Sequence, residues 1–233
     1  MIPLKDENPT HGTPWMTILL IVTNVLVSIY QWALPDAAGQ RLVLAAALVP
    51  ARLSGLVETG GLPPVITLIT CQFLHGGILH LAGNMLFLWI FGNNVEEELG
   101  SIWFLLFYLL CGVGAGLVHY LTQPMSSLPT VGASGAISGV LGAYAILFPK
   151  AQIHTLIILI LYVSVVRIPA LLWVGIWFAI QLVQGLLSKG AGGGVAWFAH
   201  VGGLLVGVIL VLIFRRPAPR RRLEPFGESW GRR

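Results

Sequence analysis

Long apolar runs separated by short polar stretches dominate the chain. Six of these runs approach the ~20 residues that a helix needs to cross the hydrocarbon core of a bilayer. Backbone N–H and C=O groups find no partners in hydrocarbon, so each run is predicted to be an α-helix and the fold to be all-α. The six predicted helices are Trp15–Leu34, Ile78–Val95, Ile102–Leu121, Gly132–Phe148, Ile168–Leu187 and Val195–Phe214.

Three segments fit this pattern less simply. The first run is longer than the ~7–15 apolar residues of a signal peptide and lacks a clear small-residue cleavage site, so we expect a retained helix. The apolar stretch Ile153–Val166 is short for a span, and we expect an interfacial or re-entrant piece on the cytoplasmic side. The long connection over residues 35–77 is partly apolar, and we expect an external loop partly embedded beside the bundle.

Composition places the chain in the membrane. Charged residues make up 9% of it and hydrophobic residues 56%, whereas a soluble domain carries about 25% charged residues. This deficit excludes a water-facing surface and indicates a multi-pass membrane protein, which we expect in a bacterial cytoplasmic membrane. Cys71 and Cys111 lie in or beside apolar segments and form neither a disulfide framework nor a zinc site, so no metal or other cofactor is expected.

Basic residues near helix ends predict the orientation. Seven arginines follow the last apolar run, five of them close to its end, and positive charge near a helix end marks the cytoplasmic side. We therefore expect a basic cytoplasmic tail over residues 215–233, a membrane domain over residues 15–214, and a cytoplasmic N-terminal tail over residues 1–14. A crossing by Ile153–Val166 would turn the basic tail outward. The excess of 13 basic over 9 acidic residues thus reflects topology and lipid contact and does not call for nucleic acid.

A Gly-x-Ser-Gly run opens the fourth predicted helix. Ser134 falls in the first helical turn, where backbone N–H groups have no intrahelical partners and could stabilise an oxyanion. Gly132 and Gly135 flank it and allow close approach of backbone or substrate. A purely structural interpretation is also available, because Gly135 and Gly139 form the GxxxG pattern of packed membrane helices.

Two further groups of polar residues lie at the same predicted depth as Ser134. His200 occupies the outer part of the last helix, where Gly203 and Gly207 provide a smooth face for close packing. His80 and Asn84 are four residues apart and share one face of the second helix. A base within reach of Ser134 and donors aimed at the same point could together support acyl transfer, although interhelical hydrogen bonding would also explain each residue.

The fourth predicted helix is short. Seventeen residues give a helix of about 25 Å, against a hydrocarbon core of ~30 Å. If its inner end reaches the cytoplasmic face, Ser134 lies below the outer surface in a pocket that water can enter.

The three elements together resemble the rhomboid family. They read His80-x-x-x-Asn84, Gly132-x-Ser134-Gly135 and Ala199-His200-x-x-Gly203-x-x-x-Gly207. The resemblance implies a six-helix rhomboid-like bundle and a serine endopeptidase with a Ser134–His200 dyad. It also implies an oxyanion hole formed by the Ser134 amide, His80 and Asn84. Its substrates would be transmembrane proteins cut near the outer ends of their helices, with the fifth helix and the 188–194 loop as gate and cap.

The acidic residues and two departures refine this expectation. All nine Asp and Glu residues lie in tails, loops or a helix end, which favours a Ser-His dyad over a Ser-His-Asp triad. Ser138 stands where some family members carry an aromatic residue against the histidine, so the group that orients His200 is left open. A tryptophan-arginine pair common in the first external loop is also missing.

Three other functions were weighed. A metalloprotease could use His75, His80 and His200, but Asn84 replaces the second histidine of the usual i, i+4 pair. A non-catalytic rhomboid-like escort factor would be expected to lack the serine or the histidine. A transporter would be expected to show a repeat and a charged midplane pathway, and neither is evident.

Overall fold

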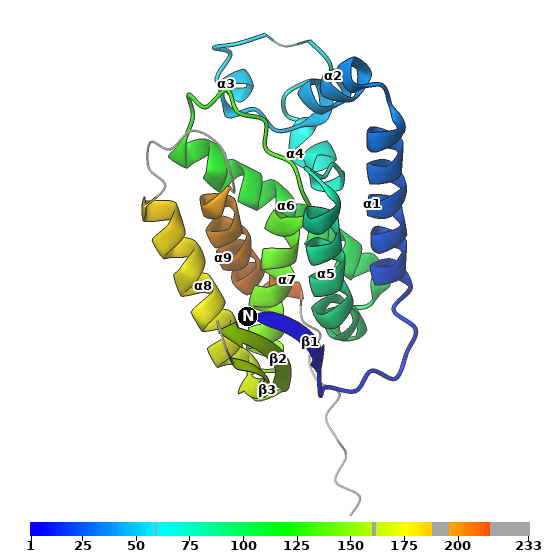
Figure 1. Ribbon diagram of the computed structural model, residues 1–233, viewed down its shortest axis with the longest axis vertical. Helices are drawn as coiled ribbons and strands as arrows, with labels where there is room; N and C mark the ends of the chain where they lie inside the picture. The colour runs from blue at the N-terminus through cyan, green and yellow to red at the C-terminus, as the bar shows by residue number, and fades with distance from the viewer. Residues whose placement is uncertain (59, 160–161, 188–195, 215–233) are drawn as a thin grey trace, which may run out of the picture.

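The computed structural model describes residues 1–58, 60–159, 162–187 and 196–214, which form a helical bundle with a small sheet at one end (Figure 1). Each of the six apolar runs contains one helix. Five helices have the length and apolar character of a membrane span, and the sixth, α7 (Ser134–Leu147), is shorter. The five longer helices are α1 (Trp15–Ala33), α5 (Ile78–Leu99), α6 (Ser101–Thr122), α8 (Ala170–Leu187) and α9 (Trp197–Phe214). The expected cap over 188–194 and the basic tail over 215–233 lie outside the described residues.

The connection between α1 and α5 folds into short helices that pack on the bundle. They are α2 (Asp36–Ala46), α3 (Pro50–Leu53), α4 (Thr67–Thr70) and the 3-10 helix η1 (Cys71–Phe73). Ala47, Leu48 and Val49 are fully buried. The buried Arg52 guanidinium donates hydrogen bonds to the carbonyls of Leu44, Gly60 and Leu62 at 2.8–3.1 Å. The connection is therefore an ordered part of the fold, cross-linked by its own arginine.

A three-stranded antiparallel sheet corrects the all-α prediction. Strands β1 (Ile2–Asp6), β2 (Gln152–Leu159) and β3 (Tyr162–Pro169) pair in the order β1-β2-β3. The stretch predicted as an interfacial or re-entrant piece is thus a hairpin, and part of the predicted N-terminal tail is its third strand. β-Branched residues fill this hairpin and favour extended backbone, and Ile153 and Thr155 alternate inward and are fully buried.

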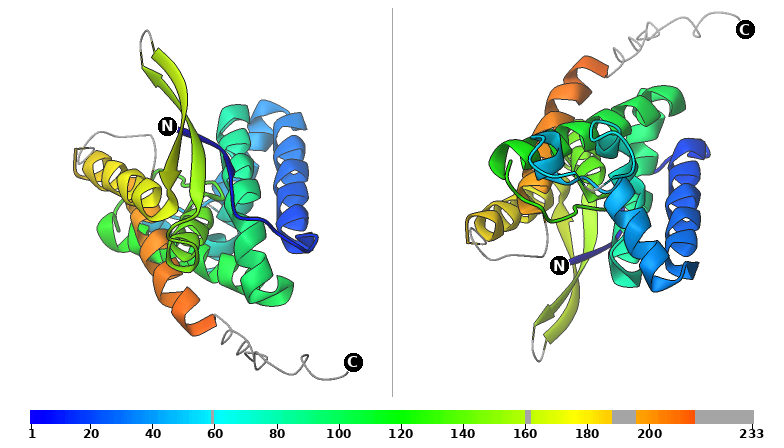
Figure 2. Two further views of the ribbon diagram at one scale, coloured as in Figure 1. Left: turned by 90° about the horizontal axis from the view of Figure 1, so that it is seen from below. Right: turned by 90° about the horizontal axis from the view of Figure 1, so that it is seen from above.

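Polar contacts fix the sheet to the helices. The Tyr144 hydroxyl, near the end of α7, donates a 2.5 Å hydrogen bond to the Asp6 carboxylate on β1. Glu7 pairs with His154 at 2.7 Å and with Arg167 at 3.4 Å. The hydrogen bond from His154, aided by the Arg167 charge, holds the pKa of the Glu7 carboxyl below its usual range. The sheet therefore anchors the end of α7 that is opposite Ser134, as the two views of Figure 2 also show.

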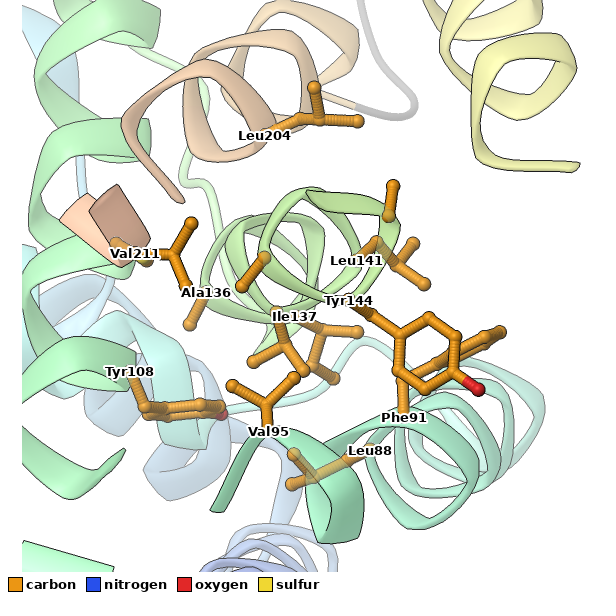
Figure 3. Packing of buried hydrophobic residues seen from close by; sticks show 14 of the residues in the cluster. Leu88, Phe91, Val95, Tyr108, Ala136, Ile137, Leu141, Tyr144, Leu204 and Val211 are labelled. Carbon is orange, nitrogen blue, oxygen red and sulfur yellow. The ribbon is translucent and has the colours of Figure 1, made fainter. Parts of the chain in front are cut away.

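Helix α7 is the centre of the bundle. Its residues from Ala136 to Ala145 are all buried, because α5, α6, α8 and α9 surround it. On one side, the rings of Phe91 and Tyr144 meet edge to face with centroids 5.0 Å apart (Figure 3). The Trp173 ring of α8 lies 5.6 Å from that of Phe91. A helix that is apolar on every face is stable only when enclosed in this way.

Glycines bring α7 and α9 into backbone contact. A Cβ atom on Gly203 would overlap the carbonyl oxygen of Gly135, and one on Gly207 would overlap the backbone of Gly139. A Cβ on Gly139 would in turn overlap the Cys111 side chain of α6. Since no side chain fits between the two backbones, these glycines fix both the separation and the register of α7 and α9.

Glu96 connects three helix ends at the sheet side of the bundle. Its buried carboxylate accepts hydrogen bonds from the backbone N–H groups of Met16 and Thr17, which open α1, at 2.9 and 2.7 Å. It also accepts from the hydroxyls of Thr17 at 2.8 Å and Ser101, the first residue of α6. The carboxylate thereby satisfies N–H groups that a helix start leaves without partners.

We predict that Gly207→Ala destabilises the fold by about 3 kcal/mol, the upper end of typical overpacking costs, because the added methyl meets backbone that cannot rotate away. Gly175→Ala in α8 is the matched control, since nothing lies within 4 Å of its Cβ position. Unfolding of both variants in a denaturing-detergent titration measures the difference. Equal stability of Gly207→Ala and the wild type would contradict the close contact.

We also predict that Glu96→Ala lowers the free energy of unfolding by about 3 kcal/mol, since hydrogen bonds to a charged group contribute ~1.5–3 kcal/mol and buried N–H groups lose their partner. Glu98→Ala, two residues further on and exposed, is expected to leave the unfolding midpoint unchanged. Equal midpoints for the two variants would show that Glu96 does not connect the helix ends.

Candidate active site

A cavity of about 970 Å³ opens at the end of the bundle opposite the sheet. The starts of α5, α7 and α9 line it, together with η1 and the second half of α6. It is the place where the three sequence elements meet, because Ser134, His80 and His200 all lie on its wall. The N-terminal ends of three helices thus converge on one cavity.

Ser134 and His200 form a direct contact in this cavity. The Ser134 Oγ lies 2.7 Å from the His200 Nε2, which is hydrogen-bond distance. Ser134 is the first residue of α7 and is half-buried, while His200 lies in the first turn of α9 and is 9% exposed. The contact of Gly203 with Gly135 brings these two helix starts together.

Gln181 of α8 is a site residue that the sequence reasoning did not identify. Its Oε1 lies 2.7 Å from the His200 Nδ1, and both side chains are buried. The family resemblance left open which group orients His200, because Ser138 replaces an aromatic residue. The Ser138 hydroxyl donates a hydrogen bond to the Ser134 carbonyl at 2.6 Å. A glutamine inside an apolar span was the signal available in the sequence, since polar side chains there commonly hydrogen-bond across helices.

His80 and Asn84 lie close to Gly132, two residues before Ser134. A Cβ atom on Gly132 would lie 2.8 Å from the His80 ring and 3.6 Å from the Asn84 Nδ2, so only glycine allows this approach. Gly132 also has a φ of 125°, which L side chains rarely adopt. Its N–H donates to the Cys71 carbonyl at 2.8 Å, which fixes the backbone that leads into Ser134.

The Asn84 amide is a donor without an acceptor in the described part of the chain. Its Nδ2 is buried and makes no hydrogen bond there. A buried donor without a partner costs about 1–3 kcal/mol, and native proteins keep few of them. Such a group, 3.6 Å from the Cβ position of Gly132, is suited to an anion that is present only during reaction.

His75 packs against His80 and is held in place by hydrogen bonds. Its backbone N–H and C=O both bond to the Gln31 side chain, at 3.1 and 2.9 Å, and its Nδ1 lies 3.2 Å from the Ser28 hydroxyl. Its ring meets that of His80 edge to face at 5.3 Å. Within the described residues, no three His, Cys, Asp or Glu side chains gather into a group that could hold a metal ion.

The arrangement can carry out acyl transfer. A hydroxyl in contact with an unprotonated imidazole nitrogen is an activated nucleophile, and neighbouring N–H donors can stabilise the negative charge of a tetrahedral intermediate. A Thr130–His119 contact at 3.0 Å and the pairing of Thr130 with Leu48 hold the opposite wall of the cavity. The site is therefore a preformed pocket around one serine.

Comparison with protein families matches residues 63–217 to the Rhomboid domain. The chain is 37% identical to Rhomboid-like protein 11, chloroplastic, of Arabidopsis thaliana over 152 residues, which are 64% of this chain and 52% of that protein. It is 38% identical to RHOMBOID-like protein 6, mitochondrial, of the same plant over 162 residues, 70% of this chain and 47% of that protein.

A bacterial relative is similar over a shorter stretch. The chain is 47% identical to Rhomboid protease GluP of Bacillus subtilis over 76 residues, which are 33% of this chain and 14% of that protein. The chain thus spans about half or less of the length of these curated relatives. The matched family range contains Ser134, His200, His80, Asn84 and Gln181.

Proposed function

This integral membrane protein belongs to the rhomboid family, and on that premise we propose that it is an intramembrane serine endopeptidase that cleaves membrane-protein substrates. The observation that carries the proposal is the 2.7 Å contact between the Ser134 hydroxyl and the His200 Nε2 at the mouth of a cavity. The Bacillus subtilis relative is named a protease, which agrees with this assignment.

The two residues divide the reaction between them. Ser134 Oγ attacks the carbonyl carbon of the scissile peptide while His200 Nε2 takes the hydroxyl proton. His200 then gives that proton to the departing amine, and an acyl-enzyme ester remains on Ser134. A water molecule, activated by the same imidazole, hydrolyses the ester and restores the hydroxyl. The cavity provides the space from which that water comes.

The tetrahedral intermediate carries its negative charge beside Gly132. We assign its stabilisation to the Ser134 backbone N–H, the Asn84 side-chain amide and the His80 ring. The unsatisfied Asn84 Nδ2 supports this assignment, because a preorganised donor requires no rearrangement when the charge develops. Positioning such donors in advance is the largest single contribution to many acyl-transfer reactions.

The helix directions support a six-span topology with both ends of residues 15–214 on one side. Asp6 contacts the end of α7, and Phe214 at the end of α9 packs on Trp103 near the start of α6, so all these points share the sheet end of the bundle. We propose that this end is cytoplasmic. Three exposed basic residues, Lys5, Lys150 and Arg167, gather there. At the opposite end Arg41 of α2 is exposed, and Arg52 is buried against carbonyls.

The depth of the site follows from the length of α7. Fourteen residues give about 21 Å, which is short of the ~30 Å hydrocarbon core. With the inner end fixed by the Tyr144–Asp6 contact, the Ser134 end lies below the outer surface. We propose that substrates are transmembrane helices cut near their outer ends, entering past α8.

The particular membrane stays a prediction. Relatives come from a bacterium and from plant proteins named for the chloroplast and the mitochondrion, so similarity supports a bacterial cytoplasmic membrane no more than an organelle. An escort function without catalysis is the second candidate among family members. The intact Ser134–His200 contact favours the protease over it.

Ser134→Ala and His200→Ala are each expected to abolish cleavage of a single-span model substrate in proteoliposomes, because either change removes the nucleophile or its base. Ser138→Ala is the matched control: it lies one turn further along α7, contacts only the Ser134 carbonyl in the described hydrogen bonds, and is expected to retain activity. A folded wild type that neither cleaves nor reacts with a fluorophosphonate probe would refute the protease assignment, and a cytoplasmic-side cut would refute the orientation.

Asn84→Ala is expected to lower kcat by ~100–1000-fold with little change in KM, which is the typical effect of removing one oxyanion donor. Gly83→Ala, the preceding residue on α5, serves as control, since nothing lies within 4 Å of its Cβ position. Steady-state cleavage kinetics in proteoliposomes measure both variants. A kcat for Asn84→Ala within a few-fold of the wild type would remove Asn84 from the oxyanion hole.

A further inference from the structure

We propose that Gln181 is the positioning residue for the base: its side-chain carbonyl holds His200 in the tautomer and ring orientation that Ser134 requires. The proposal rests on the protease function put forward above. It identifies the group that takes the place of the aspartate of a Ser-His-Asp triad. It stands on one contact, the 2.7 Å distance from Gln181 Oε1 to His200 Nδ1, and on the geometry around it.

The tautomer follows from hydrogen-bond chemistry. A neutral imidazole carries one proton, on either Nδ1 or Nε2, and only the bare nitrogen can accept. To take the Ser134 proton, Nε2 must be bare, so Nδ1 must carry the hydrogen and needs an acceptor. The Gln181 carbonyl oxygen is that acceptor, because the amide nitrogen of the same side chain can only donate.

Two equal contacts hold the ring from opposite sides. Nε2 lies 2.7 Å from Ser134 Oγ, and Nδ1 lies 2.7 Å from Gln181 Oε1. The side chains of His200 and Gln181 are 9% and 7% exposed, so water competes little for either nitrogen. Loss of the Gln181 contact would free the ring to rotate or to change tautomer, and either change withdraws the bare nitrogen from Ser134.

One face of α8 supplies both the acceptor and a packing surface. Trp177 precedes Gln181 by four residues, which places both side chains on the same side of the helix. The Trp177 ring lies 5.9 Å from the His200 ring at an interplanar angle of 33°, and Trp197 meets the same ring edge-on at 6.3 Å. The imidazole is thus held by aromatic contact and by a hydrogen bond, with Ser138 taking no part.

A neutral amide suits this position. A carboxylate buried among apolar helices loses the hydration that stabilises its charge, and it is tolerated only with strong compensating partners. An amide carbonyl offers an acceptor without that penalty. It also remains bonded when Nε2 takes a proton, because Nδ1 keeps its hydrogen in the imidazolium form.

The test compares three glutamine variants. Gln181→Met keeps the length and apolar stem of the side chain but removes the carbonyl, and Gln181→Glu keeps an acceptor oxygen. Gln184→Met, an exposed position three residues further along α8, is the matched control. Each is measured in proteoliposomes for kcat and KM, for the rate of fluorophosphonate labelling of Ser134, and for thermal unfolding.

We expect Gln181→Met to lower kcat and the labelling rate by about 10–100-fold at unchanged KM, a part of the ~100–10,000-fold that a general base contributes, with a small fall in unfolding temperature because the buried Nδ1–H loses its partner. Gln181→Glu is expected to recover part of the lost rate, because its oxygen accepts from Nδ1–H, without recovering the unfolding temperature, because its buried carboxylate loses hydration. Gln184→Met is expected to match the wild type. Wild-type kcat in Gln181→Met overturns the proposal. A loss that parallels a lower unfolding temperature and is not recovered by Gln181→Glu also overturns it.

A spectroscopic measurement separates this proposal from the protease function. Nitrogen-15 chemical shifts of labelled histidine, assigned by comparison with His200→Ala, report which ring nitrogen carries the proton. The Nδ1-protonated form is expected in the wild type and a mixture of tautomers in Gln181→Met. If the tautomer depends on Gln181 but the folded protein cleaves nothing, the protease function fails and the positioning role stands. Identical spectra for the wild type and Gln181→Met overturn the positioning role.

Discussion

The backbone contact between α7 and α9 is the interaction on which the rest of the structure depends. Ser134 and His200 belong to different helices, and neither side chain is long enough to correct a misplaced partner. The fit of Gly203 and Gly207 against Gly135 and Gly139 removes that freedom, because no side chain separates the two backbones. The 2.7 Å contact between Ser134 and His200 takes its spacing from this interface.

The helices and the serine-histidine pair could be predicted because each leaves a local signal. Apolar runs of span length specify helices, and ionisable or small residues inside them are conspicuous against that background. To predict that Ser134 and His200 meet, one must also know which helix faces contact each other. The glycine spacing in α7 and α9 indicated those faces. His80 and Asn84 were likewise expected together as oxyanion donors because their four-residue spacing places them on one helix face.

Two features could not be read from the sequence for physical reasons. The hairpin over residues 152–169 is largely apolar, and an apolar run too short to span does not reveal whether its backbone pairs within a helix or with a distant strand. Here β1, some 150 residues away, completes the sheet. Gln181 was missed because the search for a third member considered carboxylates, whereas a neutral carbonyl meets the same requirement in a buried site. The expected domain boundaries and orientation remain predictions.

The short, fully enclosed α7 has a consequence for biosynthesis. A helix of about 21 Å gains less from entering lipid by itself than a full span does, since it does not cross the hydrocarbon core. Helix α7 is enclosed only when α5, α6 and α9 surround it, and α9 is the last of these to be synthesised. A nascent chain therefore contains Ser134 long before it contains the Ser134–His200 pair, and the final helix to be inserted completes the proposed catalytic site.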